Sequence, residues 1–160
     1  MTNKGVPVEL KLTSDKLAGV HKIWLELAAA GSIGPKREEI TPARLRGMMP
    51  WTFLIDIVGE DYRFRFAGDR IIQFMGKRLQ GALLSEFRGT PFFDGMHRFF
   101  SRGAEAKIPL VSGPAPVTYP GKEHLEMEVM VLPLSEDGKA VSGFLGAFDT
   151  WRLGTHASIR

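Results

Sequence analysis

The sequence predicts an α+β domain that contains two β-hairpins. Segments with helical periodicity and segments with strand alternation follow in the order helix, two strands, several helices, three strands. The turn sequences Gly59-Glu60-Asp61 and Ser135-Glu136-Asp137-Gly138 each join two strand-like segments. A length of 160 residues with 44% hydrophobic and 24% charged residues suits one domain with its own core.

The first helix is expected over residues 14–30, after a flexible lead-in of residues 1–13. Ser14 and Asp15 are residue types that accept hydrogen bonds from the free amides of a helix start, and Gly31 is a typical stop. An apolar stripe along this helix consists of Leu17, Val20, Trp24 and Leu27. The stripe predicts packing on the same domain, and alternatively pairing with a second copy, because a short coiled coil has the same spacing.

A connector rich in glycine, proline and charge is expected over residues 31–50, with one helical turn near 43–47. A hairpin follows, with strands at 51–58 and 62–67. In its second strand Phe64 and Phe66 alternate with Arg63 and Arg65, so the sequence predicts one buried face and one charged face.

Short helices are expected at 71–75 and 79–87, and a longer one from Pro91 to about Ala106. The longer helix has a broad apolar face formed by Phe92, Phe93, Met96, Phe99, Phe100 and Ala104. Gly95 and Gly103 lower its intrinsic stability, so we expect the phenylalanines to hold it against a sheet.

The last third consists of strands at 108–111, 124–134 and 141–151, with a glycine- and proline-rich loop after the first of them. Glu126 and Glu128 alternate with apolar residues and are expected on an outer sheet face, a candidate surface for a partner. The chain is therefore interpreted as a single domain over 14–151, whose core is 51–151, with a flexible tail over 152–160.

Composition excludes several classes of function. The absence of cysteine removes disulfides, thiolate metal sites and thiolate nucleophiles. The net charge of +3 comes from arginines interleaved with apolar residues, which does not indicate nucleic-acid binding. The sequence has no apolar run of about 18 residues, so no membrane span is expected, and no secretory signal is visible, so we expect a cytoplasmic protein.

Three stretches of the sequence resemble a PAS domain, and in particular small single-domain bacterial PAS-like proteins. They are Lys22-Ile23-Trp24 with Pro35-Lys36-Arg37 and Ile40-Thr41-Pro42; Tyr62 to Gly68; and Gly76 to Gly81. The resemblance spans Leu17 to Trp151. It implies a five-stranded antiparallel sheet in the order 2-1-5-4-3, with helices that cross one face and enclose a pocket. The extra N-terminal helix would flank the sheet or pair with another subunit.

No catalytic or metal-binding motif is present, and the four histidines lie on separate elements. His97 falls at the margin of the apolar face of the Pro91 helix. Some haem-binding PAS domains hold iron through a histidine on the equivalent helix, so the resemblance leaves haem ligation by His97 as a hypothesis. A non-covalent flavin is also possible, whereas a covalent cysteinyl chromophore is excluded.

Eleven phenylalanines indicate either a solid aromatic core or a small apolar cavity. In the cavity interpretation methionines add adaptable walls, and Asp69, Arg70 or His97 holds a polar end of the ligand. The candidate lining residues are Phe53, Phe64, Phe66, Asp69, Arg70, Met75, Phe93, Met96, His97, Phe100 and Met127.

The function expected from these observations is a non-catalytic sensory or adaptor domain that binds a small molecule or a protein partner. We expect a homodimer through the N-terminal helix and a regulatory protein as partner. One alternative is a small isomerase or hydrolase that uses Asp56, Asp69 or Asp149 as a base in an apolar pocket. The other is a structural interaction module with a solid core.

Overall fold

The computed structural model describes residues 10–155, and the lead-in residues 1–9 and the tail residues 156–160 lie outside that range. The helices are α1 (Asp15–Leu27), α2 (Pro42–Leu45), α3 (Asp69–Met75) and α4 (Pro91–Ala106), with 3₁₀ turns η1 (Arg37–Glu39), η2 (Arg46–Trp51) and η3 (Leu84–Phe87). The strands are β1 (Thr52–Val58), β2 (Asp61–Ala67), β3 (Leu110–Pro116), β4 (Leu125–Leu134) and β5 (Gly143–Arg152).

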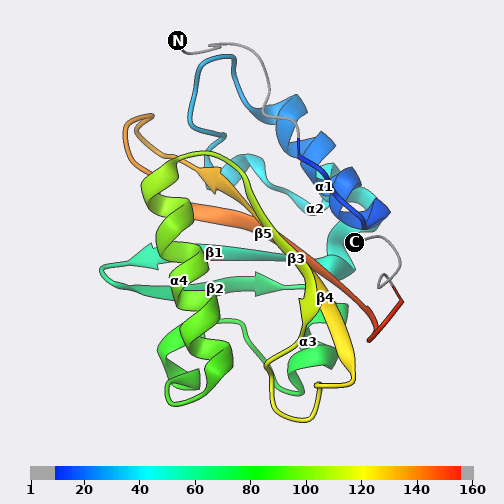
Figure 1. The fold of residues 1–160 in the computed structure, drawn as a ribbon. Coiled ribbons are helices and arrows are strands. Elements are labelled where there is room, and N and C mark those ends of the chain that lie inside the picture. The colour runs from blue at the N-terminus through cyan, green and yellow to red at the C-terminus, as the bar shows by residue number, and fades with distance from the viewer. Residues whose placement is uncertain (1–9, 156–160) are drawn as a thin grey trace.

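The five strands form one antiparallel sheet in the order β2-β1-β5-β4-β3 (Figure 1). This confirms the predicted α+β class, the strand order and the extra N-terminal helix. Parts of the two edge strands are blocked from pairing with a further strand. The backbone of Phe64 in β2 bonds to Gly81 and Ala82, and β3 carries prolines, which lack an amide proton.

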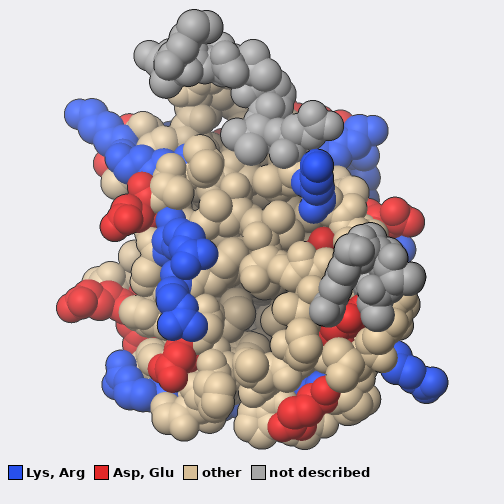
Figure 2. All heavy atoms as spheres, in the orientation of Figure 1, with Lys and Arg blue, Asp and Glu red and all other residues tan. Residues whose placement is uncertain are grey.

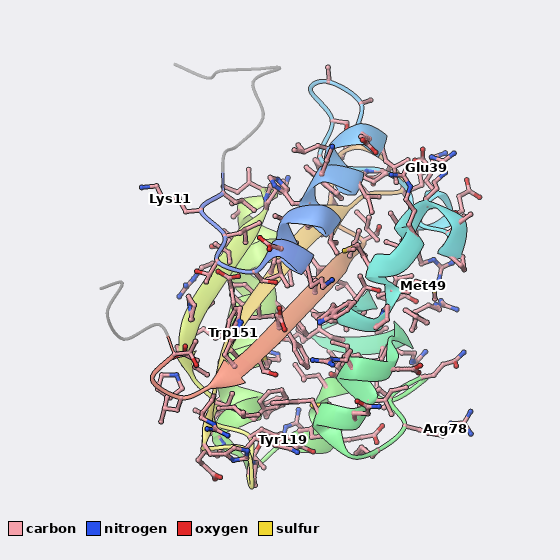
Figure 3. All side chains as sticks on the ribbon, turned by 90° about the vertical axis from the view of Figure 1, so that its right-hand side faces the viewer. Lys11, Glu39, Met49, Arg78, Tyr119 and Trp151 are labelled. Atoms are coloured by element: carbon pink, nitrogen blue, oxygen red, sulfur yellow. The ribbon has the colours of Figure 1, made fainter. Side chains whose placement is uncertain are left out.

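Both faces of the sheet are covered (Figure 1). On one face α3, η3 and α4 pack on the aromatic side chains of the strands, including Phe53, Phe64 and Phe144. On the opposite face α1 packs on β4 and β5, where Leu132 and Leu145 contribute to a second core cluster. Figure 3 shows α1 lying over these strands. The protein is thus a three-layer structure with the sheet in the middle.

The position of α1 corrects the expectation for Glu126 and Glu128. Both carboxylates are buried, with Glu128 at 0% exposure. Glu128 accepts hydrogen bonds from the backbone amides of Thr13 and Ser14, each at 2.9 Å, and the Ser14 hydroxyl donates to Asp149 at 2.8 Å. Alternation alone predicted a solvated face, but Glu128 and Asp149 instead bind the start of a helix that docks on the sheet, where the helix dipole is positive.

A β-bulge in the first hairpin corrects the expectation for Phe66. Ile55 pairs with Phe64 and Leu54 pairs with Phe66, so Arg65 is the extra residue between them. The bulge reverses the alternation, and therefore Phe64 faces α4 whereas Phe66 packs in the cluster on the α1 face.

Three further boundaries differ from the sequence prediction. The expected helix over 79–87 is only the turn η3, because Gly81 adopts a positive φ of 86° and turns the chain toward β2. The expected glycine- and proline-rich loop after 108–111 begins instead as strand β3, which continues to Pro116. The first helix ends at Leu27 rather than near residue 30.

Candidate ligand cavity

A small apolar void, termed here the interior cavity, lies between the sheet and the helices α3 and α4. Its volume is about 10 Å³, which is roughly that of one water probe. The space that the sequence predicted as a pocket is therefore nearly filled by side chains. The void is lined by Phe53, Phe64, Ile71, Met75, Leu79, Leu84, Phe92, Met96, Phe100 and Phe148.

A larger hollow, termed here the α4 groove, opens between α4 and the strands β3 and β4. Its volume is about 150 Å³. Figure 2 shows the molecular surface hollowed on this side, among uncharged atoms. The groove is lined by Phe92, Gly95, Met96, Phe99, Ser112, Ala115, Pro116, Val117, Thr118, Met127 and Val129.

Phe92 and Met96 line both hollows, so they are the wall between the groove and the interior cavity. Methionine is unbranched and has several rotatable bonds, so it adapts its shape at low cost. A change of the Met96 rotamer would extend the groove toward the centre of the domain.

Among residues 10–155, every side chain that lines the groove or the interior cavity is uncharged. The side-chain polar groups of the groove are the hydroxyls of Ser112 and Thr118. A charged ligand would lose its hydration without compensation there, whereas an apolar ligand with one neutral polar group would not. A hollow of about 150 Å³ accommodates a ligand the size of one benzene ring.

Tyr119 lies in the loop between β3 and β4, directly after the groove residue Thr118 (Figure 3). Its ring centroid lies 5.0 Å from that of Phe92 and 5.6 Å from that of Phe74. Its hydroxyl donates to the carbonyl oxygen of Met75 at 2.7 Å, at the end of α3, and burial raises the pKa of that hydroxyl. Sequence analysis missed this residue; the available signal was a lone aromatic in a glycine- and proline-rich loop.

The structure separates the predicted lining residues into two groups. Five of them line the interior cavity: Phe53, Phe64, Met75, Met96 and Phe100. Met127 lines the α4 groove together with Met96.

The remaining candidates lie elsewhere. Phe66 is on the opposite face of the sheet, and Phe93 is half-buried at the margin of the aromatic core, beneath Arg88. Asp69 and Arg70 are exposed in the first turn of α3, where Arg70 lies over the Trp51 ring. The helical start after Gly68 turns both side chains outward, so neither reaches the rim of a hollow.

His97 lies against the β1–β2 hairpin rather than toward the interior. One of its ring nitrogens is 3.0 Å from the carbonyl oxygen of Glu60, and its ring packs against Tyr62 and Phe93. An iron ligand would need that nitrogen free and a space for a macrocycle beside it. The interior cavity of about 10 Å³ offers no such space, so this arrangement does not fit haem.

The three aspartates of the enzyme hypothesis also lie away from the apolar hollows. Asp56 pairs with Arg37 and Arg65, Asp69 is exposed, and Asp149 accepts a hydrogen bond from the Ser14 hydroxyl. Within residues 10–155 no three histidine or acidic side chains are grouped to hold a metal ion. The buried base that the enzyme hypothesis needs is therefore not present at either hollow in this range.

His21 in α1 is the one buried side-chain polar group without a hydrogen-bond partner in the part of the chain that the structure describes. Its ring stacks on that of Trp24, with the centroids 6.3 Å apart. Burial disfavours the charged imidazolium and lowers the pKa of His21.

A family model with the description PAS domain matches residues 12–149 of the chain. The match includes α1 as well as the sheet and the helices on its other face. No curated protein and no solved structure matches the chain. Over residues 10–155 none of the helices combines the length and the apolar character that a bilayer crossing requires.

Proposed function

Because the chain belongs to the PAS domain family, we propose that it is a sensory domain which takes up a small uncharged ligand in the α4 groove. Domains of this family are in general sensory modules without catalytic activity. The observation that carries the proposal is the shared wall of Phe92 and Met96 between the groove and the interior cavity.

Ligand entry would act through that wall. A ligand that displaces the Met96 side chain would alter the packing of α4 on β4, because Met96 lines the groove together with Met127 and Val129 of that strand. The Tyr119 bond to the Met75 carbonyl would hold the loop between β3 and β4 against the end of α3. The result is a local shift of α4 that a partner could recognise.

The partner itself stays a proposal. Leu17, Val20 and Trp24 are buried against the chain's own sheet, so a homodimer through α1 would have to use the opposite side of that helix. A regulatory protein is the other partner that we propose. The cytoplasmic location also stays a prediction.

A structural interaction module is the second candidate function. It is favoured by the near-complete filling of the interior, where the void measures only about 10 Å³. In that case the surface of α4 and the sheet would carry the function, and the domain would bind no small molecule.

The α4 groove offers a direct test through Gly95. Gly95 lines the groove, and a Cβ at this position would meet no atom within 4 Å, so Gly95→Leu puts a large side chain at the groove and Gly95→Ala is the matched control. We expect denaturing extraction and mass spectrometry to recover a small apolar molecule from the wild type and from Gly95→Ala, and not from Gly95→Leu. Recovery of no such molecule from any of the three would favour the structural module.

A further inference from the structure

The largest of the hollows described here lies on the face of the sheet that α1 covers, at the end where the two hairpins meet. Its volume is about 390 Å³. We call it the arginine hollow, and it is lined by Arg37, Asp56, Ile57, Val58, Arg63, Arg65, Leu134, Glu136, Ser142 and Gly143. It shares no lining residue with the α4 groove or the interior cavity.

Strand register brings the charged side chains of this hollow together. Asp56 of β1 lies opposite Arg63 of β2 and opposite Gly143 of β5, so the three residues form one row across the sheet. Leu54, two residues before Asp56, belongs to the cluster beneath α1, which places the row on the α1 face. The bulge at Arg65 adds a second arginine to the same face of β2.

The third arginine comes from the connector and is held in place before any ligand arrives. The Arg37 amide donates to a Glu136 carboxylate oxygen at 3.0 Å, and the Ser135 amide donates to the Pro35 carbonyl at 3.1 Å. The β4–β5 turn is itself fixed, because the Ser135 hydroxyl donates to the Ala140 carbonyl at 2.6 Å. This rim is therefore built from hydrogen bonds within the chain.

Positive charge exceeds negative charge in the arginine hollow. One oxygen of Asp56 accepts from Arg65 Nε at 2.8 Å and from Arg37 Nη1 at 3.4 Å. The Glu136 carboxylate is occupied by the Arg37 amide. Arg63 is exposed, and over residues 10–155 its guanidinium makes neither a hydrogen bond nor an ion pair. Three guanidinium groups thus face two carboxylates, and one of the three has no partner in that range.

We propose that the arginine hollow binds a small molecule through a phosphate or carboxylate group. A guanidinium presents two parallel N–H donors, which match the paired oxygens of both groups. The volume of about 390 Å³ falls within the range of roughly 300 to 1,000 Å³ that small-molecule sites have. The side chain that would supply the free donors is Arg63, with Arg37 and Arg65 adding charge from either side.

The test is titration of the full chain with inorganic phosphate and, separately, with citrate, followed by amide NMR at constant ionic strength. Arg63→Gln removes the free guanidinium, Arg63→Lys keeps the charge without the paired donors, and Arg98→Gln is a control at an exposed arginine on α4. Salt is held constant because surface charge effects are screened. The stronger of the two anions identifies the phosphate or the carboxylate arm.

We expect saturable binding of at least one anion by the wild type and by Arg98→Gln, with amide shifts around Arg37, Asp56 and Gly143. Loss of a charge-assisted pair should weaken that binding about tenfold in Arg63→Gln, and Arg63→Lys should fall between. The proposal is overturned if neither anion binds saturably, or if Arg63→Gln and Arg98→Gln bind equally well. Neither result bears on the α4 groove, which is a separate site.

Discussion

Replacing Glu128 with glutamine should loosen the whole N-terminal layer of the protein. The carboxylate is fully buried and accepts the backbone amides of Thr13 and Ser14 at 2.9 Å each, one on each oxygen. Glutamine keeps the shape and one acceptor oxygen, but its amide group would face the second backbone N–H as a donor. One hydrogen bond to a charged acceptor is lost, which costs about 1.5 to 3 kcal/mol.

Urea unfolding measures that cost directly. We expect Glu128→Gln to lower the urea midpoint with an unchanged slope, and hydrogen exchange to accelerate at the amides of α1. Glu123→Gln is the control, because Glu123 is exposed just before the same strand. Equal stability of Glu128→Gln and Glu123→Gln, within about 0.5 kcal/mol, would refute the idea that this buried acid anchors α1.

Three further predictions concern α4, the loop after β3, and α1. Gly95→Ala should raise the free energy of unfolding by up to about 1 kcal/mol in thermal melts. Gly103→Ala should not, because its Cβ would lie 3.1 Å from a phenylalanine ring of β5. Equal gains in the two variants would contradict the packing of α4. Tyr119→Phe should cost about 0.5 to 1.5 kcal/mol in urea unfolding through loss of its bond to the α3 carbonyl, and an unchanged midpoint would show that this bond does not hold the loop. Burial lowers the pKa of His21 below its ordinary 6.5, so above pH 6.5 the ring is neutral in the folded and unfolded chains and carries no penalty. Below pH 6.5 the unfolded chain binds a proton that the folded chain excludes. The free energy of unfolding should therefore decrease as the pH is lowered below this value. His21→Leu should flatten the curve below about pH 6.5, whereas the exposed His124→Gln should not.

The sequence alone predicted most elements because their signals are local. Alternation marked the strands, helical spacing and Pro91 marked α4, and the turn sequences marked both hairpins. The strand order came from the resemblance, because no local signal specifies which strands are neighbours in a sheet.

The errors arose where the structure depends on contacts between distant segments. The bulge at Arg65 reversed the side on which Phe66 lies, and a single inserted residue leaves no mark in an alternating pattern. Glu128 appeared to be solvated because alternation cannot show that the amides of residues 13 and 14 lie above it.

The ligand-binding role of the candidate residues stays a prediction, and local signals place some of these residues better than others. Met96 and Met127 both fall on the apolar side of an amphipathic element, and the structure places both at the α4 groove. His97 lay on the margin of its helix face, where the periodicity cannot decide between the interior and the adjacent hairpin. Tyr119 is placed by a loop, whose path the sequence pattern does not define.

Uptake of an apolar ligand beside α4 is tested most directly by NMR of the methionine methyl groups during titration with benzene. The chain has 7 methionines, and four of them make the test specific. Met96 and Met127 line the α4 groove, whereas Met48 and Met49 pack in the cluster on the opposite face of the sheet. We predict saturable shifts of the Met96 and Met127 methyl signals, with the Met48 and Met49 signals unchanged. Equal shifts at all four methionines, or none at Met96 and Met127, would contradict a ligand site in the groove.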